Sequence, residues 1–314
     1  HPNLPQAQTN DGTIVIARPN KTFVIIAALS TPAANAAIYD PATQTFTAQS
    51  GSNIPTALNG AGSFALKRPD GKFLVVMGSS TAVTNIYDAN TNIFSAGPNL
   101  TGNAFLGASA IPNTDGTFTI VHGGGLTTTS LYDPVRNTMR AGPVLTTAAN
   151  CGFFAVPLQN GQFKTFAGVA ASTTGINTSM IYNPSAKTFA AGTNFPTAHG
   201  CGAFAFQKAD GHWLSVAAGS GTAGIPTNST NIINAVNGTT IAGPALSAAA
   251  GRGAHMIPRA DGTFLIIHAT STTALSSVYD PYGGTFGVGT QIGSMVAGPP
   301  MLVNPGPGAV SFQR

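Results

Sequence analysis

Short apolar runs alternate with polar turns along the chain, and the same arrangement returns every 45 to 51 residues. In each copy, a first apolar run is followed by a tight turn, a second apolar run, a loop and a third run that ends in Tyr-Asp-Pro or a similar turn. The tight turns contain Asp-Gly, Asn-Gly or Asn-Lys, which favour hairpins because Gly accepts a positive φ and Asn or Asp tolerates it. A glycine stands eight residues before each of these pairs, at Gly12, Gly62, Gly107, Gly152, Gly202 and Gly253.

The second run of each copy predicts a strand that is buried on both faces. Phe73–Val76 and Phe264–Ile267 are apolar at every position. Such strands fit sheets that are covered on both sides by other sheets. A repeat of this length that is built from strands is typical of a β-propeller. We therefore predict an all-β fold in which residues 1–314 form a single β-propeller domain.

The number of blades is less clear from the pattern. Six copies contain the third run and an outer strand after it, but seven copies contain the inner hairpin. The seventh hairpin has strands at 300–303 and 309–312, with Gly298 at the place of the repeat glycine. We predict seven blades with the last one incomplete. The alternative is six blades closed by the C-terminal segment, which would pair with the first blade and remove an exposed edge.

The fifth copy departs most from the repeat. It has lost the Tyr of the third run and the Asp-Pro turn that follows it. We therefore expect the outer edge of that blade to be the least regular.

The repeat resembles Kelch repeats, especially bacterial ones, over residues 12–314. Arg68–Gly78 reads Arg-Pro-Asp-Gly-Lys-Phe-Leu-Val-Val-Met-Gly, and Val121–Gly124 keeps the double glycine of that family. The chain departs from the family in that most copies have lost the second glycine and carry Phe or Met where Trp is usual. The resemblance implies a propeller. Kelch-type propellers include binding modules and copper radical oxidases, so function has to be argued from sites.

The chain is poor in charge. It has 13 Lys and Arg and 9 Asp and Glu, or 7% charged residues, against about 25% in ordinary soluble domains. No basic cluster is present, which argues against nucleic-acid binding. No apolar stretch approaches the roughly 20 residues of a membrane helix. Neutral polar residues replace the charges, and we expect a secreted protein that is extracellular or at a cell surface.

The two cysteines occupy matched positions, because Cys151 and Cys201 each precede a repeat glycine by one residue. Equivalent positions of neighbouring blades converge toward the axis of a propeller. A disulfide is therefore conceivable if the two backbones approach within about 7 Å. The pattern leaves open a disulfide or two buried thiols.

Polar residues gather where the inner strands begin and the second strands end, a face that we call the mouth. Asn, His and Arg side chains suit hydrogen bonding to a glycan or to a protein partner. The alternative is that they satisfy backbone groups around the channel. The candidate binding residues are Asn59, Asn103, His122, Asn150, His199, Arg252 and His268.

We find no convincing catalytic constellation in the sequence. A copper radical oxidase needs a Tyr joined to a Cys, a second Tyr and two His around one metal. The tyrosines recur with the blade and are expected to be structural. We predict no catalytic residue, no metal and no cofactor.

The sequence thus favours a non-catalytic extracellular binding or assembly module, such as a subunit of a surface layer, a fibre or an adhesin. It would bind a protein or a glycan at the mouth and form a homo-oligomer or filament, without nucleic acid and without a membrane span. The alternatives are a carbohydrate-binding, lectin-like propeller and an enzyme similar to the copper radical oxidases.

Overall fold

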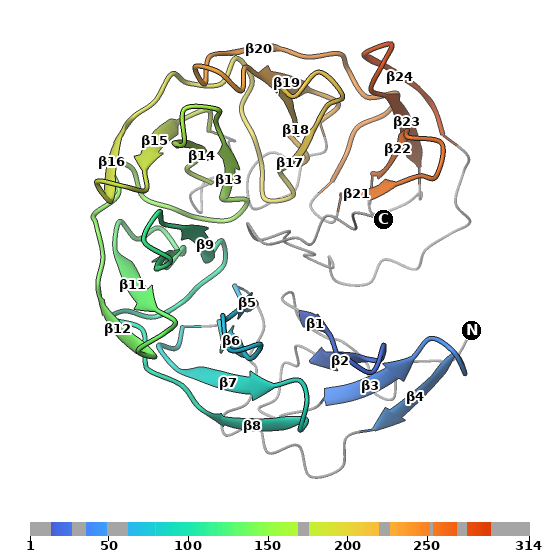
Figure 1. Ribbon diagram of the computed structural model, residues 1–314. Coiled ribbons are helices and arrows are strands. Elements are labelled where there is room, and N and C mark those ends of the chain that lie inside the picture. Colours follow the sequence, from blue (N-terminus) through green and yellow to red (C-terminus); the bar gives the residue numbers. More distant parts are fainter. Residues whose placement is uncertain are drawn as a thin grey trace. The chain divides into compact units, whose positions relative to one another are not determined.

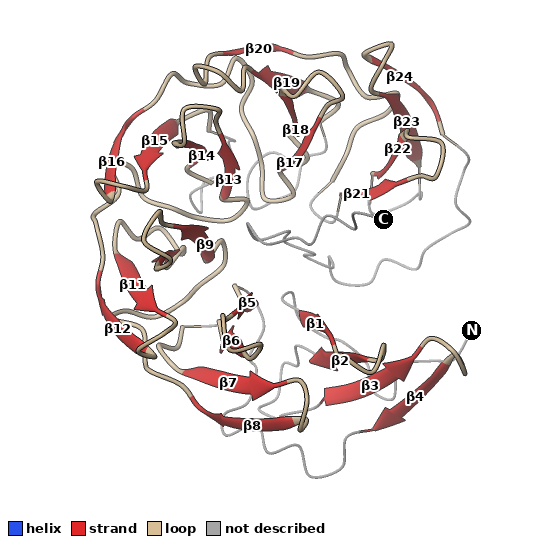
Figure 2. Ribbon diagram, viewed as in Figure 1, coloured by secondary structure: helices blue, strands red, loops and turns tan. Residues whose placement is uncertain are grey.

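The computed structural model describes strands joined by turns, and none of the described residues is helical (Figure 2). The described residues are 14–26, 36–48, 62–78, 80–168, 176–219, 227–251, 254–268 and 275–289. They include no helix long and apolar enough to cross a membrane. They divide into two compact units, which we describe separately.

The first unit holds three sheets of four antiparallel strands, each paired in chain order (Figure 1). The first sheet consists of β1 (Ile14–Ala17), β2 (Phe23–Ile26), β3 (Ala36–Asp40) and β4 (Thr45–Ala48). The second consists of β5 (Phe64–Lys67), β6 (Phe73–Val76), β7 (Thr84–Asp88) and β8 (Ile93–Ala96). The third consists of β9 (Ser109–Pro112), β10 (Phe118–Val121), β11 (Thr129–Asp133) and β12 (Thr138–Ala141).

The second unit holds three further sheets with the same pairing (Figure 1). The fourth sheet consists of β13 (Phe154–Pro157), β14 (Phe163–Phe166), β15 (Ser179–Asn183) and β16 (Thr188–Ala191). The fifth consists of β17 (Phe204–Gln207), β18 (Trp213–Val216), β19 (Thr230–Ile233) and β20 (Thr240–Ala242). The sixth consists of β21 (His255–Pro258), β22 (Phe264–Ile267), β23 (Ser276–Asp280) and β24 (Thr285–Val288).

Six such sheets are the blades of an all-β, six-bladed β-propeller fold. The prediction of seven blades is not supported, whereas its alternative of six blades agrees with the described chain. The sequence-based count rested on the hairpin at 300–312, which lies outside the described residues.

The hairpin turns form as the Asp-Gly pattern predicts. In the second blade, Gly71 has φ +80°, which glycine adopts without strain. The backbone N–H of Lys72 donates to Asp70 Oδ1 over 3.1 Å. The Asp70 side chain thus stabilises the turn by accepting a hydrogen bond, and Gly71 supplies the backbone conformation that the turn needs.

The inner strands begin one residue later than the apolar pattern predicts. The pattern predicts a strand at 108–111, whereas β9 begins at Ser109. The reason is a turn in which the N–H of Ala108 donates to the carbonyl of Phe105 over 2.9 Å. An N–H used in this turn is not available to the ladder of the sheet, so the strand starts at the next residue.

Each blade has two apolar faces. We call the face toward the following blade the leading face and the face toward the preceding blade the trailing face. In the first unit, the leading face of the first blade packs against the trailing face of the second in one buried cluster, which contains Ile14, Ile16, Val24, Phe73, Val75 and Tyr87. The same arrangement joins the fifth and sixth blades in the second unit.

The repeated tyrosines are part of these clusters. The four fully buried ones are Tyr87, Tyr132, Tyr182 and Tyr279. The ring of Tyr87 lies 4.5 Å from that of Phe94 on the neighbouring outer strand, a contact typical of aromatic packing. In the fifth blade Ile233 takes the place of the tyrosine, and its outer strand β20 has three residues where the other outer strands have four. The prediction that this edge is the least regular is confirmed.

Candidate functional site

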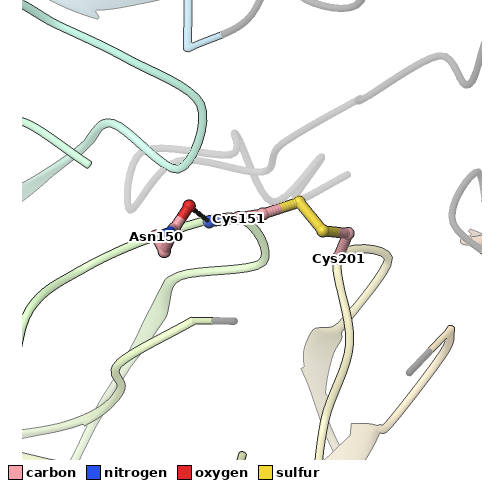
Figure 3. Close-up of a disulfide and its surroundings, with 3 residues drawn as sticks. All are labelled: Asn150, Cys151 and Cys201. Atoms are coloured by element: carbon pink, nitrogen blue, oxygen red, sulfur yellow. Dashed lines mark hydrogen bonds between the residues drawn. A yellow bond between two sulfur atoms is a disulfide. The ribbon is translucent and has the colours of Figure 1, made fainter. Parts of the chain in front are cut away.

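A disulfide joins Cys151 to Cys201 at the entries to β13 and β17 (Figure 3). The two Cα atoms are 4.7 Å apart, and both cysteines are fully buried. The backbone N–H of Cys151 donates to Asn150 Oδ1 over 2.8 Å. Of the two states that the sequence left open, the structure has the disulfide.

Equivalent turns bring the cysteines together. The N–H of Phe153 donates to the carbonyl of Asn150 over 3.0 Å, and the N–H of Ala203 donates to that of Gly200 over 3.1 Å. Gly152 has φ +78°, and a Cβ there would overlap the carbonyl oxygen of Gly200. The two backbones therefore approach this closely only because glycine follows the first cysteine.

His122 is held inside the third blade rather than at a solvent-facing surface. Its Nδ1 lies 2.9 Å from Thr128 Oγ1, and its Nε2 lies 2.7 Å from Ser130 Oγ. Burial lowers the pKa of His122 to about 4. The imidazole is therefore neutral near pH 7 and is fully bonded to hydroxyls.

His199 occupies a comparable site between the fourth and fifth blades. Its Nε2 lies 3.0 Å from Ser215 Oγ and 3.3 Å from Asn231 Nδ2. Its ring packs against those of Phe166 and Phe195, with centroids 4.8 and 4.5 Å away. Burial lowers the pKa of His199 to about 3.

In the sixth blade, His268 shares the Nε2 contact of His122 with the third strand but has no partner at Nδ1 among the described residues. Its Nε2 lies 2.8 Å from Ser277 Oγ, and burial lowers its pKa. All three imidazoles are completely buried, so the structure does not present them to a ligand at the mouth.

These histidines belong to a polar junction that recurs between blades. We call the segment between the outer strand of one blade and the inner strand of the next the link. In each case the second residue of the third strand is polar, and it bonds both to the histidine and to a hydroxyl of the link that precedes the blade. The link hydroxyls lie 2.7 to 2.9 Å from it, in the pairs Thr101–Ser130, Thr197–Asn231 and Ser247–Ser277. Sequence reasoning missed this junction, although a polar residue inside an otherwise apolar third strand is its signal.

The asparagines of the predicted binding set are more accessible. Asn103 is exposed and Asn150 is half-buried. The two asparagines do not occupy equivalent positions in the repeat. The β-bridges Thr81–Ala104 and Leu126–Ala149 make Ala104 and Ala149 equivalent, and Asn103 precedes the first of these alanines whereas Asn150 follows the second. Asn59 and Arg252 lie outside the described residues.

Lys164 on β14 is a buried ammonium group that the pattern analysis did not single out. Its side chain is completely buried; its Nζ donates to the carbonyl of Thr193 over 2.7 Å and lies 5.1 Å from the ring centroid of Phe195. Burial lowers its pKa to about 8. The sequence signal for this buried charge is its place in the repeat, because Leu74 and Leu214 occupy the equivalent positions in two other blades.

The fold defined by these blades is shared with enzymes. No family model and no curated protein matches the sequence. Among solved structures, the chain is similar to a fungal alcohol oxidase of the AA5 family in complex with copper, with 15% sequence identity and a TM-score of 0.70. The match covers 91% of this chain and 66% of that one, so the chain spans less than two thirds of the oxidase structure.

This likeness overturns two predictions made from the sequence. The sequence predicts a non-catalytic binding or assembly module and not an enzyme, whereas a solved structure with a similar fold is an oxidase. The prediction failed because it took the absence of a recognisable site in a repetitive sequence as evidence for a non-catalytic role. At this sequence identity the likeness itself establishes the fold.

The described residues do not fit a copper radical centre of the kind that the Kelch resemblance implies. Both cysteines are in the disulfide, so neither thiol can join a tyrosine. Among the described residues, no group of three or more His, Cys, Asp or Glu lies close enough to hold a metal ion. His122, His199 and His268 are each bonded to a serine hydroxyl instead.

Proposed function

We propose that this chain is the propeller part of an enzyme that oxidises alcohols. The observation that carries the proposal is the likeness of the chain, over 91% of its length, to a copper-containing alcohol oxidase. Such an oxidase transfers two electrons and two protons from a carbinol group to dioxygen, which gives a carbonyl compound and hydrogen peroxide. The proposal assigns the redox group to no described residue and does not build it from Cys151 or Cys201.

In this proposal the mouth contributes to substrate binding. The amide of Asn150 is half-buried beside the disulfide, and its Oδ1 is already used by the N–H of Cys151. Its Nδ2 is the group that can donate to an alcohol oxygen. Neutral amides suit a neutral, hydroxyl-bearing substrate better than a charged one.

Two finer proposals rest on the disulfide and on the repeat pattern. Disulfides persist in oxidising compartments, so we propose that the protein is secreted or exposed at a cell surface. The double glycine of Gly123–Gly124 and the Asp-Gly turns support a Kelch-type repeat. Alkylation of thiols at harvest, followed by peptide mass analysis, tests the first: the peptides of Cys151 and Cys201 should be linked and unmodified in the exported protein.

Oxygen consumption tests the proposed activity. The full chain, with and without added copper(II), is incubated with a panel of primary alcohols that ranges from short aliphatic alcohols to sugars. The expected result is alcohol-dependent oxygen uptake with one peroxide formed per oxygen consumed. A folded protein that consumes no oxygen with any alcohol under either condition would contradict the proposal.

A matched pair of variants tests the role of Asn150. Asn150→Asp keeps the acceptor for the N–H of Cys151 but removes the donor, whereas Asn160→Asp changes an exposed turn residue. If Asn150 binds the substrate, the first variant raises the KM for the alcohol about 10-fold, as expected for the loss of a bond worth about 1.4 kcal/mol, and the second leaves it unchanged. Equal KM values in both variants would remove Asn150 from the site.

A further inference from the structure

Five asparagines of the chain begin the triplet Asn-x-Ser/Thr, which is the acceptor sequence for N-linked glycans. All five side chains are exposed, at Asn20, Asn99, Asn177, Asn228 and Asn237. Among the other described asparagines, by contrast, Asn85, Asn113 and Asn231 are buried. The triplet is defined by the hydroxyl of its third residue as well as by the asparagine, so that hydroxyl must also be accessible. This second condition separates the five triplets.

In three of the triplets the hydroxyl is part of the tertiary structure. Ser179 Oγ and Thr230 Oγ1 each donate to a backbone carbonyl, over 2.7 and 2.6 Å, and both residues are buried. Thr101 Oγ1 lies 2.9 Å from Ser130 Oγ in the polar junction. The fold itself therefore uses the hydroxyls of the triplets that begin at Asn99, Asn177 and Asn228.

The other two triplets lie in exposed turns and share one geometry. Between β1 and β2, Thr22 Oγ1 donates to Asn20 Oδ1 over 2.7 Å, and it accepts from Arg18 Nη1 over 3.3 Å. Between β19 and β20, Thr239 Oγ1 donates to Asn237 Oδ1 over 2.8 Å. The middle residue of the triplet has φ of 66° in the first turn and 72° in the second.

These turns leave the nitrogen of each asparagine available. The backbone N–H of the threonine donates to the same Oδ1 as its hydroxyl, over 3.2 Å in the first turn and 3.0 Å in the second. The turn thus engages the oxygen of the amide. Within the described part of the chain, neither Asn20 Nδ2 nor Asn237 Nδ2 has a hydrogen-bond partner.

We propose that Asn20 and Asn237 are the favoured N-glycosylation sites of this chain. Transfer forms a bond between Nδ2 and C1 of a sugar, breaks the bond from C1 to the pyrophosphate of a lipid-linked oligosaccharide, and releases one Nδ2 proton. The amide oxygen keeps its lone pairs, so the hydrogen bonds of the turn survive the modification.

The position of the two turns fits a bulky modification. Each lies at the end of its own blade opposite to the mouth, because successive strands are antiparallel and second strands end at the mouth. A glycan there does not cover the mouth end of that blade. The inference rests on the proposed export of the chain and not on the proposed oxidase activity.

Expression of the full chain in a eukaryotic host tests the proposal, with a cleavable signal that directs the chain into the secretory pathway. Glycans are released by an amidase in heavy-oxygen water, which converts each occupied asparagine to a labelled aspartate, and peptides are mapped by mass spectrometry. The expected result is label at Asn20 and Asn237 in most molecules, and in few molecules at Asn99, Asn177 and Asn228. Because the signal is supplied, the result does not depend on where the protein resides naturally. Unlabelled Asn20 and Asn237 in the secreted, folded chain would overturn the proposal, and so would equal labelling of all five.

A designed site tests whether the geometry of the turn is responsible. In the third blade, Thr117 Oγ1 donates to Asp115 Oδ1 over 2.6 Å in a turn of the same kind, and Asp115→Asn creates the triplet Asn-Gly-Thr there. This variant should gain a glycan at position 115. Thr239→Ala, at an exposed position, should lose only the glycan at Asn237. A folded Asp115→Asn variant without a glycan at 115 would overturn the proposal that the turn favours modification.

Discussion

The buried histidines show how a single residue type can be misjudged from the sequence. His122, His199 and His268 recur near the ends of strands, which suggested donors at a binding surface. Each is instead buried and bonded to a serine hydroxyl. A neutral imidazole offers both a donor and an acceptor, so it satisfies buried hydroxyls without carrying charge into the core.

The lowered pKa values of these histidines predict a loss of stability in acid. The unfolded chain binds a proton at each histidine with a pKa near 6.5, whereas the pKa in the fold is about 4 for His122 and about 3 for His199. Their contribution is therefore complete above about pH 6.5 and is lost as the pH falls toward 4 and 3. The loss approaches about 1.4 kcal/mol per pH unit for each histidine.

Urea unfolding at pH 7.0, 5.5 and 4.5 measures this effect. His199→Ala, which copies the alanine at the equivalent positions 149 and 250, should show a shallower fall in the free energy of unfolding than the unsubstituted chain. The carboxylates contribute equally to the pH dependence of both proteins. The difference between the two curves of unfolding free energy against pH therefore measures the contribution of His199. Parallel curves would contradict the assignment.

Lys164 gives a second prediction at this scale. Lys164→Leu restores the residue of two other blades and removes a buried ammonium, and the Thr193 carbonyl still accepts from Ser179 Oγ. We expect the free energy of unfolding at pH 7 to rise by about 1 kcal/mol or more. The advantage should shrink between about pH 8, the pKa in the fold, and about pH 10.4 in the unfolded chain, because the unsubstituted lysine is then neutral in the fold. A destabilised Lys164→Leu variant at pH 7 would show that the ammonium group has a net favourable role.

At the scale of elements, glycines are required for different reasons. Gly71 in a hairpin turn has no atom within 4 Å of an added Cβ, whereas a Cβ on Gly152 would overlap the carbonyl of Gly200. Gly71→Ala should therefore cost only the strain of a left-handed residue, about 1 to 2 kcal/mol, and Gly152→Ala clearly more. Thermal unfolding of the two variants measures the difference, and equal losses would argue that the backbones near the disulfide can move apart freely.

The disulfide acts on two neighbouring blades. It closes a loop with a sequence separation of 50 residues, for which chain entropy predicts about 4 kcal/mol. We expect the double variant Cys151→Ser, Cys201→Ser to lose about 2 to 5 kcal/mol of unfolding free energy and to exchange amides faster in β13 and β17. If the double variant and the native chain are equally stable under reducing conditions but differ under oxidising conditions, the loss of stability is due to the missing disulfide rather than to the substitutions.

For the whole molecule, periodicity was a better guide than individual side chains. The repeat glycines, the Asp-Gly turns and the apolar second strands predicted four-stranded blades, because turn chemistry and burial act locally and recur. The count of blades went wrong at 300–312, where a hairpin pattern without outer strands was taken as a blade. The candidate site was predicted less well, because His122 is buried against Gly102, Thr128 and Ser130, and the repeat pattern alone does not reveal these contacts.

The polar junctions have a consequence for exchanging blades between propellers. The link before a blade pairs with the blade behind it through backbone bridges such as Thr81–Ala104, which any sequence can form. Its side chains, such as Thr101 and His199, bond to the blade ahead. A transplanted blade should therefore carry its upstream link with it, so that the natural cutting point for shuffling lies just after an outer strand rather than at the start of an inner one.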